Sequence, residues 1–462
     1  MRQTYKTFLL MGITVACLLF MHMLPALSLG DKQLKPVSIL SDLSKAPSDK
    51  VEEEEAALPA PMMPKADNNG AAVAEVQEVW PNGIERIYDY SGGAPGGMAH
   101  FYKMLSILAA KKGASLKRPV RIAYYGDSFI EGDILTADLR EFLQQHYGGE
   151  GPGWVDAGNP INSMRLTART TFSGMTEHTV MKKQSGYSAA QAGIYERYYT
   201  ANAGARTTYK GSTQFAHSKK WMTSRFYFRS NNAQTIKINI DGMGQFDKQV
   251  QGSPNVQMIE MKGPMNNITY TMGGASTLYG AGLETDGGIV IDNFSMRGSS
   301  GMTLANLPES TLKDFARLRP YDLIVIQFGQ NALHARGTNA SYTAYMNNMK
   351  KVVQLFRKCF PEASILLVSV GDRGQRGPNG WTTIKTLDNM IACQQQAAAD
   401  MKIGFYNLFH AIGGPGTIVK LVNQGMAAKD YIHINYKGGK VVAKPIFDSM
   451  VQGQRNYSKA HP

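Results

Sequence analysis

Three short, predominantly apolar runs constrain the fold of this 462-residue chain most strongly. They comprise residues 289–291, 321–328 and 364–370, and stretches with helical spacing of apolar residues, 342–358 and 384–401, separate or follow them. Strands that are apolar along their whole length are buried on both faces. Their alternation with helices is typical of a parallel sheet covered on both sides. The C-terminal half therefore predicts an α/β fold.

The same alternation occurs earlier in the chain. Residues 100–112 have helical spacing, residues 120–125 form an apolar run, and residues 134–147 again have helical spacing. Gly126-Asp127-Ser128 lies between that run and the second helix. Ser128 is therefore predicted on a strand-to-helix turn at the carboxyl end of the sheet, where ligands bind in open α/β folds.

Residues 155–285 differ in composition from the rest. They are rich in Thr, Ser, Gly, Asn and aromatic residues and contain short runs of alternating polarity, at 224–228, 235–242 and 256–261. Such runs, bounded by Gly and Asn turns, are typical of antiparallel strands. We expect an inserted β-sandwich over residues 156–285. The alternative is a decorated loop region of one domain.

The first 80 residues predict an export segment and a tether. Residues 1–30 combine an early positive charge, an apolar stretch from Phe8 to Phe20 and small residues at 26–28, as in a signal peptide. The longer apolar stretch from Phe8 to Leu29 is about long enough to span a bilayer, so an uncleaved membrane anchor is the alternative. Residues 31–80 contain several prolines and the acidic run 52–55, so a disordered linker is expected. Either reading predicts an exported protein of the periplasm or cell envelope.

The charge balance bears on partners. Lys plus Arg total 49 against 36 Asp plus Glu, a net charge of +13. Such an excess favours anionic polymers or lipid headgroups. Nucleic acid is not expected, because there is no zinc motif, basic helix or aromatic-rich RNA-binding signature.

The residues that carry chemistry lie far apart in the chain. A serine hydroxyl becomes a good nucleophile when a histidine, itself held by a carboxylate, removes its proton. His433, with Asp430 three residues before it, is the best candidate base for Ser128. The alternatives are an N-cap role for Ser128, and a surface ion pair or metal-ligand pair for Asp430 and His433. No further metal ligands at suitable spacing stand out.

Acyl transfer also needs hydrogen-bond donors for the tetrahedral oxyanion. Asn331 follows the strongest apolar run, 321–328, and Gly298 follows the run 289–291. Both would then face the same cleft as Ser128, whose own N–H is a third donor. The alternative for each is a structural role in a loop.

These motifs occur in the order that is typical of one family. Their sequence along the chain resembles that of the SGNH hydrolases, also called the GDSL esterase family, over about residues 95–155 and 287–450. The motifs are Gly-Asp-Ser at 126–128, Gly298, Gly-x-Asn at 329–331 and Asp-x-x-His at 430–433. The resemblance implies a three-layer, flavodoxin-like parallel sheet with an SGNH hydrolase domain at residues 81–155 and 286–455, interrupted by the sandwich.

The resemblance also implies roles for the motif residues. Ser128 corresponds to the nucleophile and Asp430 with His433 to the catalytic pair, while the oxyanion hole comprises Ser128 N–H, Gly298 and Asn331. No metal or organic cofactor is implied.

Two details depart from the family pattern. Ala332 stands where the family often has Asp, although that position is not one of the catalytic four. The second motif is the loosest match: Gly298 is the expected donor, and Gly301 is the alternative.

A finer resemblance extends from residues 126–133 to the glycine-rich stretch 148–153. It is similar to bacterial peptidoglycan O-acetylesterases, in which a sandwich resembling a carbohydrate-binding module interrupts the hydrolase domain. This implies an exported serine esterase that removes O-acyl groups, above all O-acetyl, from a cell-envelope glycan such as peptidoglycan. An O-acyltransferase with the same site and a non-catalytic glycan-binding protein are the alternatives, and the oligomeric state stays open. Glu131 and Asp133 are expected to be structural, because negative charge suits the start of a helix.

Overall fold

The computed structural model describes residues 9, 13–14, 28–29, 32–33, 56–63 and 78–462. Most of the predicted export segment 1–30 and of the predicted linker 31–80 lies outside these residues. Among the described residues, no helix has the length and apolar character to cross a bilayer. The chain divides into two compact units, Met1–Glu54 and Glu55–Pro462. In the first, the short strands β1 (Ser28–Leu29) and β2 (Lys32–Gln33) pair antiparallel.

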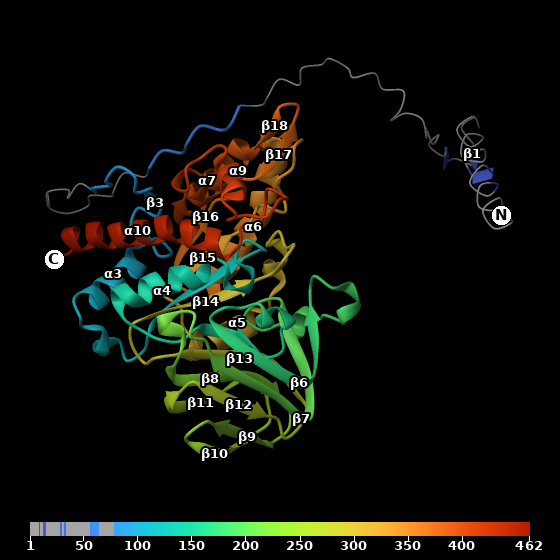
Figure 1. Cartoon of the computed structure of the whole chain (residues 1–462), viewed down its shortest axis with the longest axis vertical. Helices are drawn as coiled ribbons and strands as arrows, with labels where there is room; N and C mark the ends of the chain where they lie inside the picture. Colours follow the sequence, from blue (N-terminus) through green and yellow to red (C-terminus); the bar gives the residue numbers. More distant parts are fainter. Residues whose placement is uncertain (1–8, 10–12, 15–27, 30–31, 34–55, 64–77) are drawn as a thin grey trace. The chain divides into compact units, whose positions relative to one another are not determined.

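The second unit is built on a six-stranded sheet in the order β14-β4-β15-β16-β19-β3 (Figure 1). Its strands are β3 (Ile87–Asp89), β4 (Val120–Gly126), β14 (Ile289–Ser295), β15 (Leu323–Gln327), β16 (Ser364–Val368) and β19 (Gly404–Tyr406). The predicted parallel pairing holds from β14 to β19. The edge strand β3 is antiparallel to β19, so the sheet is mixed. With only three residues, β3 has no apolar run that could have predicted it.

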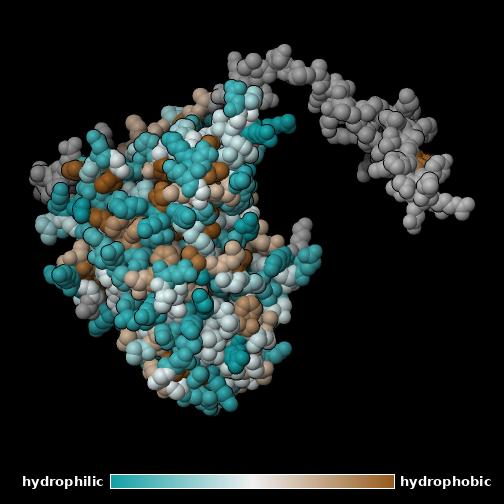
Figure 2. All heavy atoms as spheres, in the orientation of Figure 1, coloured by the Kyte–Doolittle hydropathy of each residue, from teal (hydrophilic) through white to brown (hydrophobic). Residues whose placement is uncertain are grey.

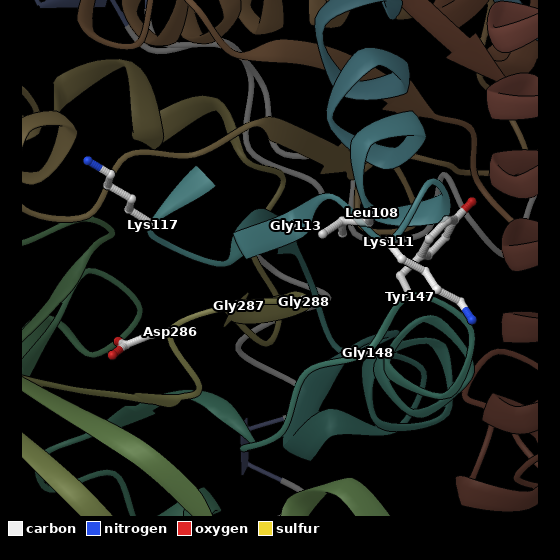
Figure 3. A pocket seen from close by; sticks show the side chains of 9 residues that line it. All are labelled: Leu108, Lys111, Gly113, Lys117, Tyr147, Gly148, Asp286, Gly287 and Gly288. Carbon is white, nitrogen blue, oxygen red and sulfur yellow. The ribbon is translucent and has the colours of Figure 1, made fainter. Parts of the chain in front are cut away.

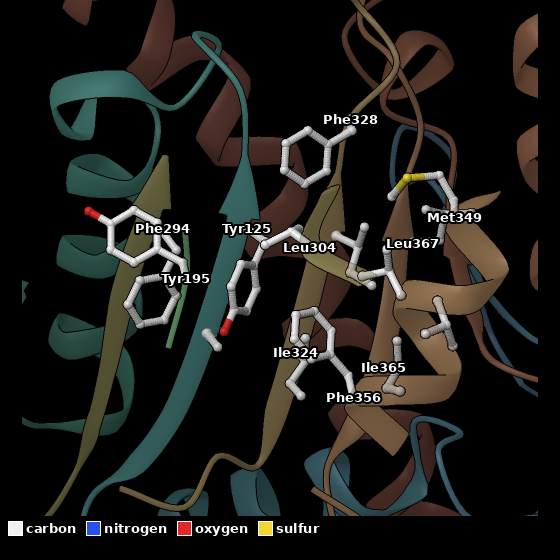
Figure 4. Packing of buried hydrophobic residues seen from close by; sticks show 14 of the residues in the cluster. Tyr125, Tyr195, Phe294, Leu304, Ile324, Phe328, Met349, Phe356, Ile365 and Leu367 are labelled. Carbon is white, nitrogen blue, oxygen red and sulfur yellow. The ribbon is translucent and has the colours of Figure 1, made fainter. Parts of the chain in front are cut away.

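Helices cover both faces of this sheet. Those on one face are α3 (Ala99–Ala109), α4 (Thr136–Tyr147) and α10 (Tyr436–Ala460), and those on the other are α5 (Glu309–Leu318), α6 (Asn339–Cys359) and α7 (Leu387–Met401). Two short helices, α8 (Leu408–Ala411) and α9 (Thr417–Asn423), precede α10. In Figure 4 the side chains of Tyr125, Ile324 and Phe356 meet between the sheet and α6, and the Tyr125 and Phe356 rings are 4.8 Å apart. Neighbouring residues along each strand pack against opposite helix layers, as continuous apolar runs require.

The part between α4 and β14 contains an antiparallel sheet of nine strands within the described residues. These are β5 (Gly153–Asp156), β6 (Ala168–Thr179), β7 (Arg197–Gly211), β8 (Trp221–Ser230), β9 (Gln234–Ile240), β10 (Gly244–Val250), β11 (Ser253–Met265), β12 (Asn267–Thr271) and β13 (Ser276–Glu284). They enclose their own apolar cluster, in which the Phe226 and Tyr270 rings stack 4.4 Å apart. The predicted antiparallel strands are thus present in this part of the chain, whereas the domain bounds 156–285 and the packing as a two-layered sandwich stay predictions.

Buried ion pairs join the insert to the α/β part. Glu284, at the end of β13, has a side chain with no exposed area and accepts hydrogen bonds from Arg121 of β4, Arg319 after α5 and Arg225 of β8. Burial alone would raise the pKa of Glu284, but the guanidinium groups outweigh it and hold the pKa well below its usual value. Removing one partner of such a buried pair typically costs about 3–5 kcal/mol. The insert is therefore firmly oriented against the sheet.

Two surface features complete the fold. On the face shown in Figure 2, hydrophilic residues predominate and hydrophobic ones are scattered. Within the predicted linker, Leu58 and Met63 pack against the apolar cluster that includes α6, and Asn339 donates a hydrogen bond to the Ala56 carbonyl at 2.8 Å.

Candidate active site

The structure brings together Ser128, His433 and Asp430. Ser128 Oγ lies 2.9 Å from His433 Nε2, across 305 residues of sequence. On the other side of the ring, His433 Nδ1 lies 2.7 Å from Asp430 Oδ2. Ser128 is 9% exposed, whereas the side chains of His433 and Asp430 are 31% and 46% exposed. The three groups form a hydrogen-bonded chain that runs from a nearly buried hydroxyl to a solvent-accessible carboxylate.

Ser128 owes its position to the tight turn that follows β4. A Cβ atom on Gly126 would lie 3.0 Å from Ile130 and 3.1 Å from the Gln327 carbonyl, so the strand end is closely packed. Asp127 Oδ1 then accepts a hydrogen bond from Phe129 N–H at 2.9 Å, which closes the turn.

The helix after Ser128 begins later than the sequence predicts. A 3₁₀ turn, η2 (Glu131–Asp133), intervenes, and α4 starts only at Thr136. Ser128 is therefore followed by a 3₁₀ turn and not directly by an α-helix. The physical reason is the positive φ of Gly132 (60°) and Asp133 (71°), which interrupts helical geometry.

Asp430 holds His433 with both carboxylate oxygens. Oδ1 accepts from Ile432 N–H and His433 N–H at 2.9 and 3.1 Å, while Oδ2 faces the ring. Burial raises the pKa of Asp430, but the hydrogen bonds from His433 and Ile432 outweigh it and lower the pKa below its usual value. An ionised carboxylate favours the tautomer with hydrogen on Nδ1. The Nε2 lone pair then faces the Ser128 hydroxyl.

An aromatic pair supports this loop from outside. Tyr431 has a positive φ of 58°, which is unusual for a bulky residue. Its ring stacks on Trp381 with centroids 4.1 Å apart, and its carbonyl accepts from Gly374 N–H at 2.7 Å. Trp381 and Gly374 belong to a hairpin of β17 (Gly374–Gly377) and β18 (Gly380–Thr383).

Sequence reasoning missed this hairpin. The turn residues Gly-Pro-Asn-Gly at 377–380 are the signal that could have predicted it. Its packing on Tyr431 has no local signal in the sequence.

Asn331 connects three loops at the site. Its Nδ2 donates to the Ser299 carbonyl at 2.9 Å and to Asp127 Oδ2 at 3.2 Å. Asp127 is buried, which raises its pKa to about 6 against the opposing effects of the Phe129 N–H, His433 and Asn331.

Gly298 lies in the loop after β14. Met296 N–H donates to the Gly126 carbonyl at 2.9 Å, which sets this loop against the nucleophile turn. The Gly301 N–H donates to Ser299 Oγ at 3.0 Å, and a Cβ on Gly301 would lie 2.6 Å from Phe328. Gly298 is exposed, and among the described residues no protein group accepts its N–H. This N–H is thus available to a ligand, whereas Gly301 serves the packing of the loop.

The two acidic residues after Ser128 are part of the framework. Glu131 pairs with Arg297 at 2.8 Å. The buried Asp133 accepts from Arg140 and Arg165, both within 3.0 Å, so its pKa is held well below the usual value despite burial. Arg140 belongs to α4 and Arg165 to the insert, so Asp133 ties these parts together beneath the nucleophile turn.

Comparison with known proteins gives evidence on the fold. No protein-family model and no curated protein match the chain. A solved structure described as "Peptidoglycan O-acetylesterase in action, 5 min" matches with a TM-score of 0.64 and 22% identity, over 80% of this chain and 99% of the other. This chain has the fold of that esterase.

Two more distant structures also match. A family two carbohydrate esterase from Cellvibrio japonicus has a TM-score of 0.27 and 10% identity, over 63% of this chain and 99% of the other. The salicylyl-acyltransferase SsfX3 has a TM-score of 0.29 and 11% identity, over 64% and 96%.

Within this esterase fold, a large cavity lies away from Ser128. It has a volume of about 650 Å³ and is lined by residues such as Lys111, Lys117, Tyr147 and Gly288 (Figure 3). Lys117 and Gly288 precede β4 and β14, so the cavity opens at the amino edge of the parallel strands. In Figure 3 the two lysine side chains point away from each other. Their positions do not form a charged site.

Proposed function

We propose that this protein is an exported serine esterase that removes O-acyl groups, above all acetyl, from a cell-envelope glycan such as peptidoglycan. The observation that carries the proposal is the hydrogen-bonded chain from Ser128 Oγ through His433 to Asp430. Residues 1–30 would direct export or anchor the protein to the membrane.

The reaction begins with proton transfer at the nucleophile. His433 Nε2 takes the proton of Ser128 Oγ as that oxygen attacks the ester carbonyl carbon, 2.9 Å being a suitable donor–acceptor distance. The carbonyl oxygen becomes an oxyanion that accepts from Ser128 N–H, Gly298 N–H and the Asn331 amide. Each such donor typically contributes about 10²–10³ in rate.

The intermediate then collapses in two stages. The bond to the sugar oxygen breaks, and that oxygen takes the proton from His433 Nε2, which leaves the acyl group on Ser128. Water attacks the acyl-enzyme carbonyl while His433 takes its proton, and the carboxylic acid is released as the proton returns to Ser128 Oγ. Asp430 stays ionised and stabilises the imidazolium in both stages, since its lowered pKa keeps it charged.

Two observations support a glycan substrate. The solved structure with the same fold is described as a peptidoglycan O-acetylesterase and is matched over 99% of its length. The net charge of +13 also suits an anionic envelope polymer. Acetyl esters of sugar hydroxyls are therefore the substrate class to test first.

The decisive experiment locates the reactive serine. The protein is treated with a serine-directed phosphonate, digested and analysed by mass spectrometry, and hydrolysis of 4-nitrophenyl acetate is measured in parallel. We expect the label on Ser128, and at least about a 10³-fold loss of turnover in Ser128→Ala. Ser115→Ala, at an exposed serine, is the control and should keep both labelling and turnover. Labelling elsewhere, or normal turnover by folded Ser128→Ala, would contradict the proposal.

A further inference from the structure

A smaller cavity lies beside the nucleophile turn, where the insert meets the α/β part. Its volume is about 230 Å³. The α/β part contributes Glu131, Met296 and Arg297, and the insert contributes among others Pro160, Ile161 and Met181. We refer to it as the joint pocket.

The joint pocket shares its wall with the catalytic loops. Glu131 N–H donates to the Ser128 carbonyl at 3.3 Å. The Met181 methyl group lies 3.2 Å from where a Cβ on Gly298 would stand, so the insert contacts the loop of the candidate oxyanion donor. A group bound here would thus lie beside the loops that carry Ser128 and Gly298.

The charges around the joint pocket are already paired with one another. Arg297 pairs with Glu131 at 2.8 Å, and Lys182 pairs with Glu177 at 2.9 Å. Arg197 lies 3.3 Å from Glu177 and 3.2 Å from Asp156, so three cations face three carboxylates. Because each charge has a protein partner, the pocket offers no unbalanced charge, and its ligand should be neutral.

The remaining lining is apolar and adaptable. Met181 is 43% exposed, although an apolar side chain of this size is usually buried. Met296 is held in place by Thr179, whose Oγ1 lies 3.4 Å from the Met296 sulfur. Methionines form soft surfaces that fit varied apolar shapes. The outer rim is polar, since the side chains of Arg297 and Lys182 are 61% and 64% exposed.

We propose that the joint pocket is a subsite for one neutral, N-acylated sugar unit next to the sugar that carries the ester. This inference rests on the proposed esterase function. The sugar's C–H face and acyl methyl would contact Met181 and Met296, and its hydroxyls would hydrogen-bond with the rim. The volume is below the ~300–1,000 Å³ that is typical for drug-sized ligands, which suits one sugar unit and not a longer glycan.

The test fills the pocket and compares two substrates. Met181→Trp places a larger side chain in the pocket, and kcat/KM is measured for O-acetylated peptidoglycan fragments and for 4-nitrophenyl acetate. The small ester has no sugar to occupy the subsite. We expect the ratio of glycan to small-ester kcat/KM to fall about tenfold or more, mainly through a higher KM for the glycan.

Met222→Trp is the matched control. Met222 lies on β8, is 42% exposed and is not part of the joint pocket, so the ratio should stay at the wild-type value. If Met181→Trp lowers both reactions equally, the smaller variant Met181→Ala decides. A fall in its ratio supports the subsite, and an unchanged ratio overturns it.

Direct binding gives an independent readout. Triacetylchitotriose is titrated into Ser128→Ala and followed by NMR, alone and in combination with Met181→Trp. We expect weak binding that is insensitive to salt and is lost in the double variant. Binding that persists there overturns the subsite, whereas a wild-type protein that hydrolyses neither ester overturns the proposed function itself.

Discussion

Asp127 and Asp322 lie at opposite ends of the parallel strands: Asp127 follows β4 at the carboxyl end, which we call the carboxyl edge, and Asp322 precedes β15 at the amino end, the amino edge. Both are almost completely buried. At the amino edge, Asp322 accepts hydrogen bonds from Arg118, His100 and the Arg121 N–H, which outweigh burial and lower its pKa to about 2. At the carboxyl edge, Asp127 has no arginine or lysine partner among the described residues, and burial raises its pKa to about 6. The partners of Asp322 thus stabilise its buried charge, whereas the buried charge of Asp127, next to Ser128, has no cationic partner of this kind among the described residues.

The cavities show the same contrast. The cavity of about 650 Å³ lies at the amino edge, without a paired nucleophile and base in its lining. Ser128, Asn331 and His433 gather at the carboxyl edge, where successive parallel strands end in loops. The size of a cavity therefore does not indicate where the candidate active site lies in this protein, whereas the direction of the parallel strands does.

The largest effect is expected at the outer end of the hydrogen-bonded chain. Asp430→Asn keeps the shape but removes the charge that holds His433 in its productive tautomer, so kcat should fall about 10³-fold or more. Hydrolysis of 4-nitrophenyl acetate measures this. Asp448→Asn, which breaks a surface pair with Lys444, is the control and should be near normal. A loss below tenfold in Asp430→Asn would mean that another group orients the base.

The two buried aspartates should change stability in opposite directions. Asp127 has a raised pKa in the fold, so ionising it costs stability as pH rises from about 4 through 6. Asp127→Asn should therefore raise the free energy of unfolding by up to about 3 kcal/mol at pH 7 and by less near pH 4. Its activity should fall, because Asn331 loses a charged acceptor. Urea unfolding at both pH values measures the gain.

For Asp322 the sign is reversed. Its lowered pKa contributes stability above about pH 4 that is lost as pH falls through about 2. Asp322→Asn should therefore lose about 2–3 kcal/mol at pH 7 without changing the pH profile of activity. If both variants changed the free energy of unfolding in the same direction, the proposed difference between the two buried aspartates would be wrong.

A smaller effect is expected from the aromatic support of the Asp430–His433 loop. Trp381→Ala removes the stacking on Tyr431, a contact of about 0.5–1.5 kcal/mol, so kcat should fall about two- to tenfold with little change in KM. Trp381→Phe should restore most of kcat, which identifies a positioning role. Failure of Phe to restore it, or an unaffected Ala variant, would argue against this support.

The smallest effect is expected at the amino edge. Lys117→Ala alters the lining of the large cavity and should leave kcat/KM for glycan and small ester within about twofold, the range of a surface substitution away from the site. A tenfold loss for the glycan alone would show that this cavity also binds substrate.

Features that depend only on residues close together in the sequence could be predicted from the sequence. The apolar run before Gly126, and the three-residue spacing of Asp430 and His433, depend on local periodicity and short-range hydrogen bonds. The same holds for the alternation that separates the insert from the α/β part. The edge strand β3 and the packing of Trp381 on Tyr431 were missed, because both depend on neighbours distant in the chain. The 3₁₀ turn after Ser128 and the hairpin that carries Trp381 were missed although their turn residues are local signals.

The sequence by itself determined the alternation of the four parallel strands β4, β14, β15 and β16 with helices, and the chemical types that follow these strands, since both can be recognised from periodicity along the chain. Only the tertiary structure decided that Met181 of the insert contacts Gly298, and that Trp381 stacks on Tyr431. It also decided which buried aspartate has arginine partners. Such contacts join residues far apart in sequence, and their energies depend on burial and distance, which exist only once the elements have packed.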